Sequence, residues 1–249
     1  MKALRPVGFP LKGVALALLI LTLGVATAGA TTISYTTPSG AMEPSSGLPV
    51  SAEATFVTGT NSVTLTLMNL LADPRSVAQN LSDLFFTLST GQTSGAVSSS
   101  SGVERRVLAD GTFTDGPSPV STGWTLETVG SQLHLTLLGS GTQPKHTIIG
   151  PPDTGDGYTN ANRSIKANKP HNPFLAEEAE FTLSIPGVSA ASTITSATFS
   201  FGTADGDLVP GIDPFPPSFA QVPEPQTVLL LGLGLAWLGG IARRRHHRK

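Results

Sequence analysis

The sequence contains no cysteine in its 249 residues and has few charged side chains, at 13% of the total. The absence of cysteine excludes disulfides, thiolate metal ligands and cysteine nucleophiles. Stability must then come from a hydrophobic core, and the roughly 190 residues between the two ends are enough to build one. The chain has two tryptophans and two tyrosines, so no aromatic platform for stacking against sugars stands out.

Basic residues are scarce in the middle of the chain. Seven of the fifteen Lys and Arg residues and all seventeen Asp and Glu residues fall between positions 31 and 225, which gives this region a net charge of −10. An acidic body repels nucleic acids and anionic lipids, so we expect no nucleic-acid partner. The remaining basic residues lie near the two ends, where they read as topology signals rather than as binding patches.

The first thirty residues have the three parts of a secretory signal peptide. They begin with three basic residues and no acidic one, continue with an apolar run at 14–25, and end in Ala28-Gly29-Ala30. Ala28 and Ala30 occupy the two positions that a signal peptidase reads. The alternative is a permanent membrane helix, but the run would span about 18 Å against a hydrocarbon core of about 30 Å. We therefore expect residues 1–30 to be removed, leaving Thr31 as the first residue.

The central region, residues 50–205, has the pattern of short β-strands. Apolar residues alternate with polar ones over 52–56 and again over 63–67, with a Gly-Asn turn between them. Such a pair is typical of a β-hairpin with one buried face. The fold predicted for this region is all-β, an antiparallel β-sandwich or jelly-roll-like body. The other segments expected as strands are 84–88, 124–126, 133–137, 181–185 and 194–201.

Four further segments lack this alternation. Residues 31–49 are rich in Thr, Ser, Pro and Gly and are expected to form a flexible leader. Residues 89–102 are expected to form a mobile loop, and residues 206–222 a Pro-rich linker. The loop at 139–175 is long enough to be functional or disordered. Its scattered apolar residues predict that it packs partly onto the sandwich.

The sequence carries no recognisable catalytic motif. The H-E-x-x-H, G-x-S-x-G and P-loop spacings are absent, and no nucleophile with its base stands out. His134 falls on the polar side of an alternating strand and is expected to be solvated. His171 is expected to make a hydrogen bond that packs its loop. We assign no catalytic residue, no cofactor and no metal ligand.

Two groups of acidic residues leave calcium binding open as an alternative. Asp205, Asp207 and Asp213 form one group, and Asp153 and Asp156 form the other. Carboxylates are ligands that Ca²⁺ prefers, but an EF-hand loop would need further ligands and a terminal glutamate, which are missing. Ordinary acidic turns are the simpler interpretation.

The C-terminal segment 223–249 has three parts. Pro223-Glu224-Pro225 comes first, and residues 228–242 follow without a charge. As a helix this run would be about 22 Å long, short for a full span, but flanking basic side chains can snorkel and extend it. The closing basic cluster favours the cytoplasmic side of a membrane. Its charged members are Arg243, Arg244, Arg245, Arg248 and Lys249.

This three-part arrangement resembles the PEP-CTERM sorting signal, in which Pro-Glu-Pro, a glycine-rich apolar helix and an Arg-rich end follow in the same order. Here those parts are Pro223-Glu224-Pro225, a transmembrane helix at 228–242 and the basic tail 243–249. The resemblance implies processing by exosortase, a membrane-embedded transpeptidase, in a Gram-negative bacterium that makes exopolysaccharide. The body would pass through the secretion machinery, lose its signal peptide to signal peptidase, and be anchored transiently in the inner membrane before reaching the cell surface or the medium. The alternative is an ordinary anchor that is never cut.

Three functions remain for the central body. The first is a non-enzymatic surface or extracellular-matrix protein that associates with exopolysaccharide in a biofilm. The second is a carbohydrate- or calcium-binding module. The third is a secreted hydrolase, which would need a cleft with convergent carboxylates. The missing catalytic motifs favour the first.

Overall fold

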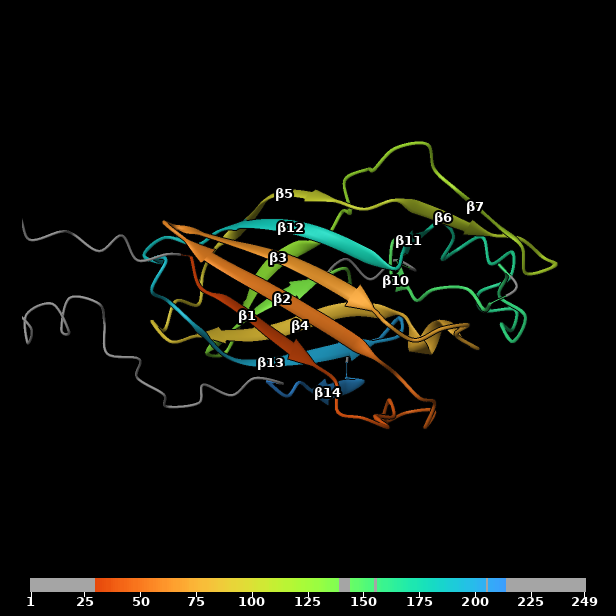
Figure 1. The fold of residues 1–249 in the computed structure, drawn as a ribbon, viewed down its shortest axis with the longest axis horizontal. Helices are drawn as coiled ribbons and strands as arrows, with labels where there is room; N and C mark the ends of the chain where they lie inside the picture. The colour runs from red at the N-terminus through yellow and green to blue at the C-terminus, as the bar shows by residue number, and fades with distance from the viewer. Residues whose placement is uncertain (1–29, 139–143, 155, 205, 214–249) are drawn as a thin grey trace, which may run out of the picture.

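The computed structural model describes residues 30–138, 144–154, 156–204 and 206–213. Within these residues the protein consists of two β-sheets packed face to face and one short 3-10 turn, η1 (Val77–Gln79). Figure 1 shows the five-stranded sheet in front and the strands of the nine-stranded sheet behind it and at one end. The predicted all-β class is confirmed for this part of the chain.

The five-stranded sheet has the order β1-β2-β3-β12-β5, and all its neighbouring pairs are antiparallel. Its strands are β1 (Thr32–Thr36), β2 (Ala52–Gly59), β3 (Ser62–Asn69), β12 (Glu178–Ser184) and β5 (Ala96–Ser101). Along β2, buried residues alternate strictly with half-buried ones, as the two-residue period of a strand requires. The predicted hairpin is confirmed, because β2 and β3 pair over their full lengths.

The nine-stranded sheet runs β14-β13-β4-β10-β11-β6-β7, with β9 also beside β4 and β8 beside β9. Its strands are β4 (Leu81–Leu88), β6 (Glu104–Val107), β7 (Phe113–Asp115), β8 (Thr125–Val129), β9 (Gln132–Thr136), β10 (Ile148–Ile149), β11 (Phe174–Ala176), β13 (Ile194–Phe201) and β14 (Leu208–Pro210). β10 and β11 are parallel, so the sheet is mixed rather than purely antiparallel. A parallel pair needs a long connection, and the loop between these two strands supplies it.

The main hydrophobic core lies between the two sheets. Phe56 and Phe181 enter it from the five-stranded sheet, and Phe86 and Phe199 enter it from the nine-stranded sheet. The rings of Phe56 and Phe86 meet with centroids 5.3 Å apart. Each of these side chains is fully buried, which stabilises the fold by about 1.5–3 kcal/mol per ring relative to exposure.

A backbone bridge joins the edges of the two sheets on the β1 side. Ile212 follows β14 and pairs with Thr36 at the end of β1. The amide of Thr36 donates to the carbonyl of Ile212 at 2.9 Å, and the amide of Ile212 donates back at 2.8 Å. On the opposite side, β5 lies next to β8. Both edges of the five-stranded sheet are therefore partly covered, which limits edge-to-edge association.

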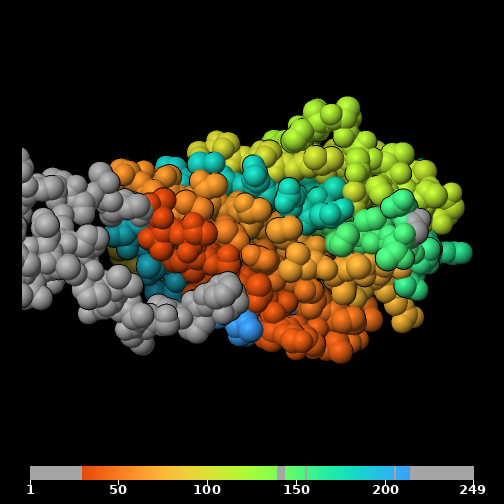
Figure 2. All heavy atoms as spheres, in the orientation of Figure 1, coloured from red at the N-terminus to blue at the C-terminus, as the bar shows by residue number. Residues whose placement is uncertain are grey.

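A second, smaller core covers one end of the sandwich. It is formed by seven buried residues from η1, the long loop and the strands beside it: Val77, Val107, Ile149, Tyr158, Ala161, Ile165 and Phe174. Figure 2 shows the segment from residue 144 onward, in green, at this end of the molecule. The prediction that the loop at 139–175 packs partly onto the sandwich is confirmed for its described residues.

The expectation of a flexible leader at 31–49 is wrong. β1 lies within this segment and pairs with β2 along its whole length. Ile33 and Tyr35 point inward to the main core, and the buried carboxylate of Glu43 accepts the amide of Ser45 at 2.8 Å. Ser, Thr, Pro and Gly surround β1 and hide its alternation, because these residues are typical of a loose segment.

Two other boundaries also differ from those expected. Residues 89–102, expected to be a mobile loop, contain β5, which pairs with β12. The body does not end at residue 205, because β14 and the bridge at Ile212 continue it. The linker predicted at 206–222 thus begins inside the fold. The remaining predicted strands are confirmed as β4, β8, β9, β12 and β13.

Candidate functional site

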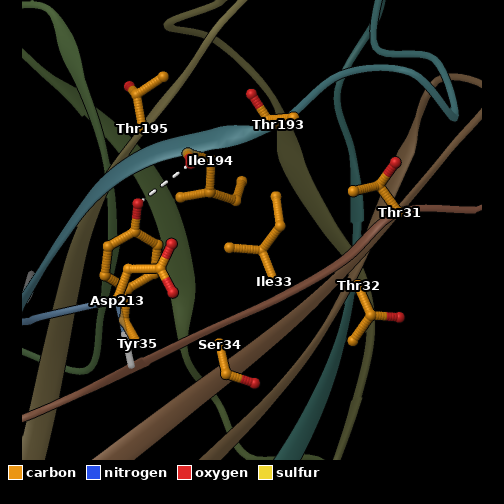
Figure 3. Close-up of a pocket in the computed structure, with 9 residues that line it drawn as sticks. All are labelled: Thr31, Thr32, Ile33, Ser34, Tyr35, Thr193, Ile194, Thr195 and Asp213. Carbon is orange, nitrogen blue, oxygen red and sulfur yellow. Dashed lines mark hydrogen bonds between the residues drawn. The ribbon is translucent and has the colours of Figure 1, made fainter. Parts of the chain in front are cut away.

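A cavity of about 850 Å³ opens between the first half of β1 and the start of β13, and we call it the β1–β13 slot. Residues 31–35 form one wall, residues 193–195 form the other, and Asp213 lies at its end (Figure 3). Among the described residues, the backbone bridge beside the slot is the one between Thr36 and Ile212. Sequence analysis did not indicate the slot, since its walls are brought together by long-range packing.

The slot offers apolar contacts and hydroxyl groups. Ile33 and Ile194 point toward one another in its centre (Figure 3). The hydroxyl of Tyr35 donates to the carbonyl of Ile194 at 3.1 Å. Burial raises the pKa of Tyr35, and the negative charge of Asp213 raises it further. The phenol therefore stays neutral and acts as a hydrogen-bond donor at physiological pH.

A charge cluster centred on Arg105 lies at the end of the molecule that carries the second core. Its Nε and Nη2 atoms donate to the two carboxylate oxygens of Asp115, each at 2.7 Å. Its Nη1 atom donates to Glu177 at 2.9 Å and to the hydroxyl of Tyr158 at 3.1 Å. The guanidinium also lies 4.2 Å from the centroid of the Phe113 ring. This is the bidentate, stacked geometry that favours arginine over lysine.

The electrostatics of this cluster are those of a structural anchor. Burial alone would lower the pKa of Arg105, but the hydrogen bonds to Asp115, Tyr158 and Glu177 outweigh it and raise the pKa above its usual value. Burial raises the pKa of Tyr158 to about 12, and neighbouring Arg105 offsets part of that rise. The hydroxyl of Tyr158 donates in turn to the carbonyl of Gly150 at 2.7 Å. Arg105 and Tyr158 therefore both keep their protons near neutral pH.

His134 is buried rather than solvated, which corrects the expectation from the sequence. Its ring stacks on Phe85 with centroids 3.9 Å apart, and Nε2 lies 3.5 Å from the carboxylate of Asp83. The hydroxyl of Thr136 donates to the same carboxylate. The side chain does point away from the main core, as the alternation predicted, but its cross-strand neighbours on β4 cover it.

Two other histidines hold loops in place. His171 Nδ1 makes a hydrogen bond to the carbonyl of Pro144 at 3.0 Å, which confirms the predicted loop-packing contact. His146 makes one hydrogen bond through Nδ1 to the carbonyl of Thr122 at 3.0 Å and another through Nε2 to Glu104 at 2.8 Å. A carbonyl can only accept, so Nδ1 of His146 is the donor to Thr122.

Two of the acidic residues considered for calcium accept hydrogen bonds from hydroxyl groups. Asp153 accepts the hydroxyl of Thr159 at 2.7 Å, and Asp207 accepts the hydroxyl of Ser45. Asp205 lies outside the described residues. In the part of the chain that the structure describes, no three His, Cys, Asp or Glu side chains gather as a metal site.

The residues predicted to direct export and sorting lie almost entirely outside the described residues. These are Ala28, the Pro-Glu-Pro motif at 223–225, the apolar run at 228–242 and the basic tail at 243–249. Ala30 is the first described residue and is exposed. Among the described residues, no helix has the length and apolar character needed to span a membrane.

The described body and the sequence beyond it define a β-sandwich followed by a C-terminal sorting segment. Residues 221–246 match the family model of the PEP-CTERM protein-sorting motif, so the chain is a PEP-CTERM sorting domain-containing protein, as the resemblance predicted. The motif implies processing by exosortase, export, and transient membrane anchoring before release at the surface. No curated protein and no solved structure matches the chain.

Proposed function

We propose that this protein is a non-enzymatic component of the cell surface or extracellular matrix of a Gram-negative bacterium, delivered by signal peptidase and exosortase in turn. The sorting motif at residues 221–246 is the observation that carries the proposal. Exosortase acts at the membrane, so its substrate must first be exported and held there. The signal peptide expected at residues 1–30 supplies the first requirement, and the apolar run at 228–242 supplies the second.

The contacts of Thr31 support cleavage after Ala30. The hydroxyl of Thr31 donates to the carbonyl of Ala190 at 2.9 Å, and its carbonyl accepts the amide of Thr58 at 3.2 Å. Ala30 itself is exposed. A new N-terminus at Thr31 would therefore be tied to β2 and to the loop before β13 from its first residue.

The composition of the tail suits each step of the proposed sorting. Residues 228–242 place the substrate in the bilayer, and the cluster that starts at Arg243 keeps the last residues in the cytoplasm. Pro223 and Pro225 favour an extended backbone and cannot donate hydrogen bonds through their own nitrogens. The segment just outside the membrane thus stays open for an enzyme to read.

The surface of the body supports a role in a hydrated matrix. The outer face of the five-stranded sheet carries rows of hydroxyl groups, in which Thr55 lies opposite Thr66 and Thr64 lies opposite Thr182. Such hydroxyls can exchange hydrogen bonds with water and with the hydroxyls of an exopolysaccharide. The strongly perturbed groups, Arg105 and Tyr158, bind one another, which favours a structural rather than a catalytic body.

Replacement of Pro223-Glu224-Pro225 by alanines tests the sorting role. Membrane insertion depends on apolar length and flanking charge, so the variant should still insert. In a host with an exosortase it should accumulate uncut in the inner membrane, while the parent reaches the surface. The matched control replaces the exposed Pro117-Ser118-Pro119, which lies in the body and outside the motif, by alanines and should be sorted like the parent. Equal sorting of the motif variant and the parent would leave the tail as a simple anchor.

A further inference from the structure

One side of β1 has backbone groups without partners in the described structure. Thr31 bonds toward β2 through its carbonyl, whereas Thr36 bonds away from β2, to Ile212. Backbone groups of alternate residues in an antiparallel strand point to the same side. Those of Thr32 and Ser34 therefore point the same way as those of Thr36, toward the slot. No described residue pairs with these two backbone groups.

The slot also lies at the point where the chain leaves the described structure. Asp213 is the last described residue of the body and lines the slot itself. We propose that residues 214–217 of the same chain, Pro-Phe-Pro-Pro, dock in the β1–β13 slot as an extended segment beside β1. The occupant would prolong the backbone pairing that the bridge at Ile212 begins.

The register of the bridge gives the docked backbone its partners. Because this pairing is antiparallel, each residue after Ile212 lies opposite a residue one position further back along β1. Pro214 then lies opposite Ser34. Pro216 lies opposite Thr32. Proline lacks an amide donor but keeps its carbonyl. These two carbonyls therefore accept the amides of Thr32 and Ser34, which no described residue binds. The prolines fall where a strand tolerates them, at an edge.

The same register places one large apolar side chain over the slot. Phe215 lies opposite Ile33, and directly opposed residues point to the same face of a sheet. Ile33 points toward Ile194 across the slot (Figure 3). Phe215 would fill the space between them and beside Tyr35. Burial of this ring would stabilise the docked segment.

Docking would limit the distance between the body and the sorting motif, a consequence that rests on the proposed function. From Asp213 to Pro223 a free chain can extend by about 33–36 Å. With residues 214–217 held against the body, the remaining six residues extend by only about 20 Å. The body would then stay close to the membrane surface while the motif is read, so that docking shapes the substrate presented to exosortase.

Hydrogen exchange on the mature chain, residues 31–249 in detergent micelles, tests the docking. The parent should protect the amides of Thr32 and Ser34. Phe215→Ser should raise their exchange rates about tenfold or more, while Phe219→Ser, beyond the docked segment, should leave them unchanged. The amides of β2 and β3 report whether each variant remains folded. Because no exosortase is present, this result is independent of sorting.

Three outcomes would overturn the docking. The first is fast exchange of both amides in the parent, as expected of a free strand edge. The second is protection that Phe215→Ser does not reduce, since the segment 214–217 would then not be the occupant. The third is protection that rises with protein concentration, which would identify a second copy of the chain at the β1 edge.

Discussion

Glu177 holds Arg105 by an ion pair of 2.9 Å from a backbone position with a φ of +67°. This single residue separates β11 of the nine-stranded sheet from β12 of the five-stranded sheet. Its amide donates to the carbonyl of Ile149, and its carbonyl accepts the amide of Asn69. The left-handed turn at Glu177 thus lets the chain pass from one sheet to the other while its side chain anchors the loop end.

The turn at Glu177 predicts an unusual order of stability among its variants. Glycine adopts a positive φ at little cost, whereas alanine does not. Both replacements remove the half-exposed carboxylate, so the difference between them reports the backbone alone. Glu177→Gly should be more stable than Glu177→Ala by about 1 kcal/mol. Urea unfolding of the two purified proteins measures this, and equal midpoints would show that the turn carries no strain.

The charge cluster predicts that Arg105 matters far more than its neighbour. Arg105→Met removes hydrogen bonds to three partners and leaves the hydroxyl of Tyr158 without a donor, so the free energy of unfolding should fall by about 3 kcal/mol. Arg106 is exposed on the same strand, and Arg106→Met should change it by less than about 0.5 kcal/mol. Chemical denaturation of both proteins measures the two free energies of unfolding. Equally small changes would show that the cluster is only a surface ion pair.

Gly150 is predicted to tolerate no side chain. A Cβ atom there would lie 2.0 Å from the carbonyl oxygen of Leu71, which is backbone and cannot swing away. Gly150→Ala should therefore destabilise the protein by about 3 kcal/mol. Gly116 provides the control, because a Cβ there meets its nearest atom at 3.6 Å. Thermal unfolding of the two variants should separate them, and similar melting temperatures would mean that the loop gives way at Gly150.

The two tyrosines predict a loss of stability at alkaline pH. Burial raises the pKa of Tyr158 from 10.0 to about 12, and the pKa of Tyr35 is raised as well. The folded state then binds protons more tightly than the unfolded state. The stabilisation is complete below pH 10 and is lost as the pH rises from 10 toward 12.

The absorbance of tyrosinate measures this directly, because Tyr35 and Tyr158 are the only tyrosines in the sequence. The folded protein should ionise neither residue near pH 10, and ionisation should coincide with unfolding at higher pH. The same protein in urea should titrate near pH 10. Titration of both residues near pH 10 in the folded protein would show that neither phenol is buried.

Sequence patterning predicted the strands whose own residues carry the alternation. The hairpin of β2 and β3 and the second half of β13 are of this kind, since their apolar residues repeat at every second position over 52–56, 63–67 and 197–201. The same alternation predicted that Leu133 and Leu135 point inward, and both are fully buried. The local pattern is enough to predict a strand and its buried face where one side of the strand packs against the core.

Long-range pairing accounts for what was missed. His134 is buried because Phe85 and Asp83 lie beside it on β4, and nothing in its own strand shows this. The slot likewise depends on β1 and β13 meeting at one edge. Their facing residues are far apart in the sequence, as the hydrogen bond between Tyr35 and Ile194 shows, with a separation of 159. The sorting motif was found because its recognition depends on the order of residues along the chain and on no tertiary contact.

The intact mass of the protein collected from the cell surface or the medium tests the central claim most directly. Processing at both ends predicts a species that begins at Thr31 and lacks the basic tail 243–249. Peptide mapping of both termini would identify the two cuts separately. A surface-exposed protein that still contains residues 1–30, or that retains Arg243 to Lys249, would contradict the account of a substrate processed first by signal peptidase and then by exosortase.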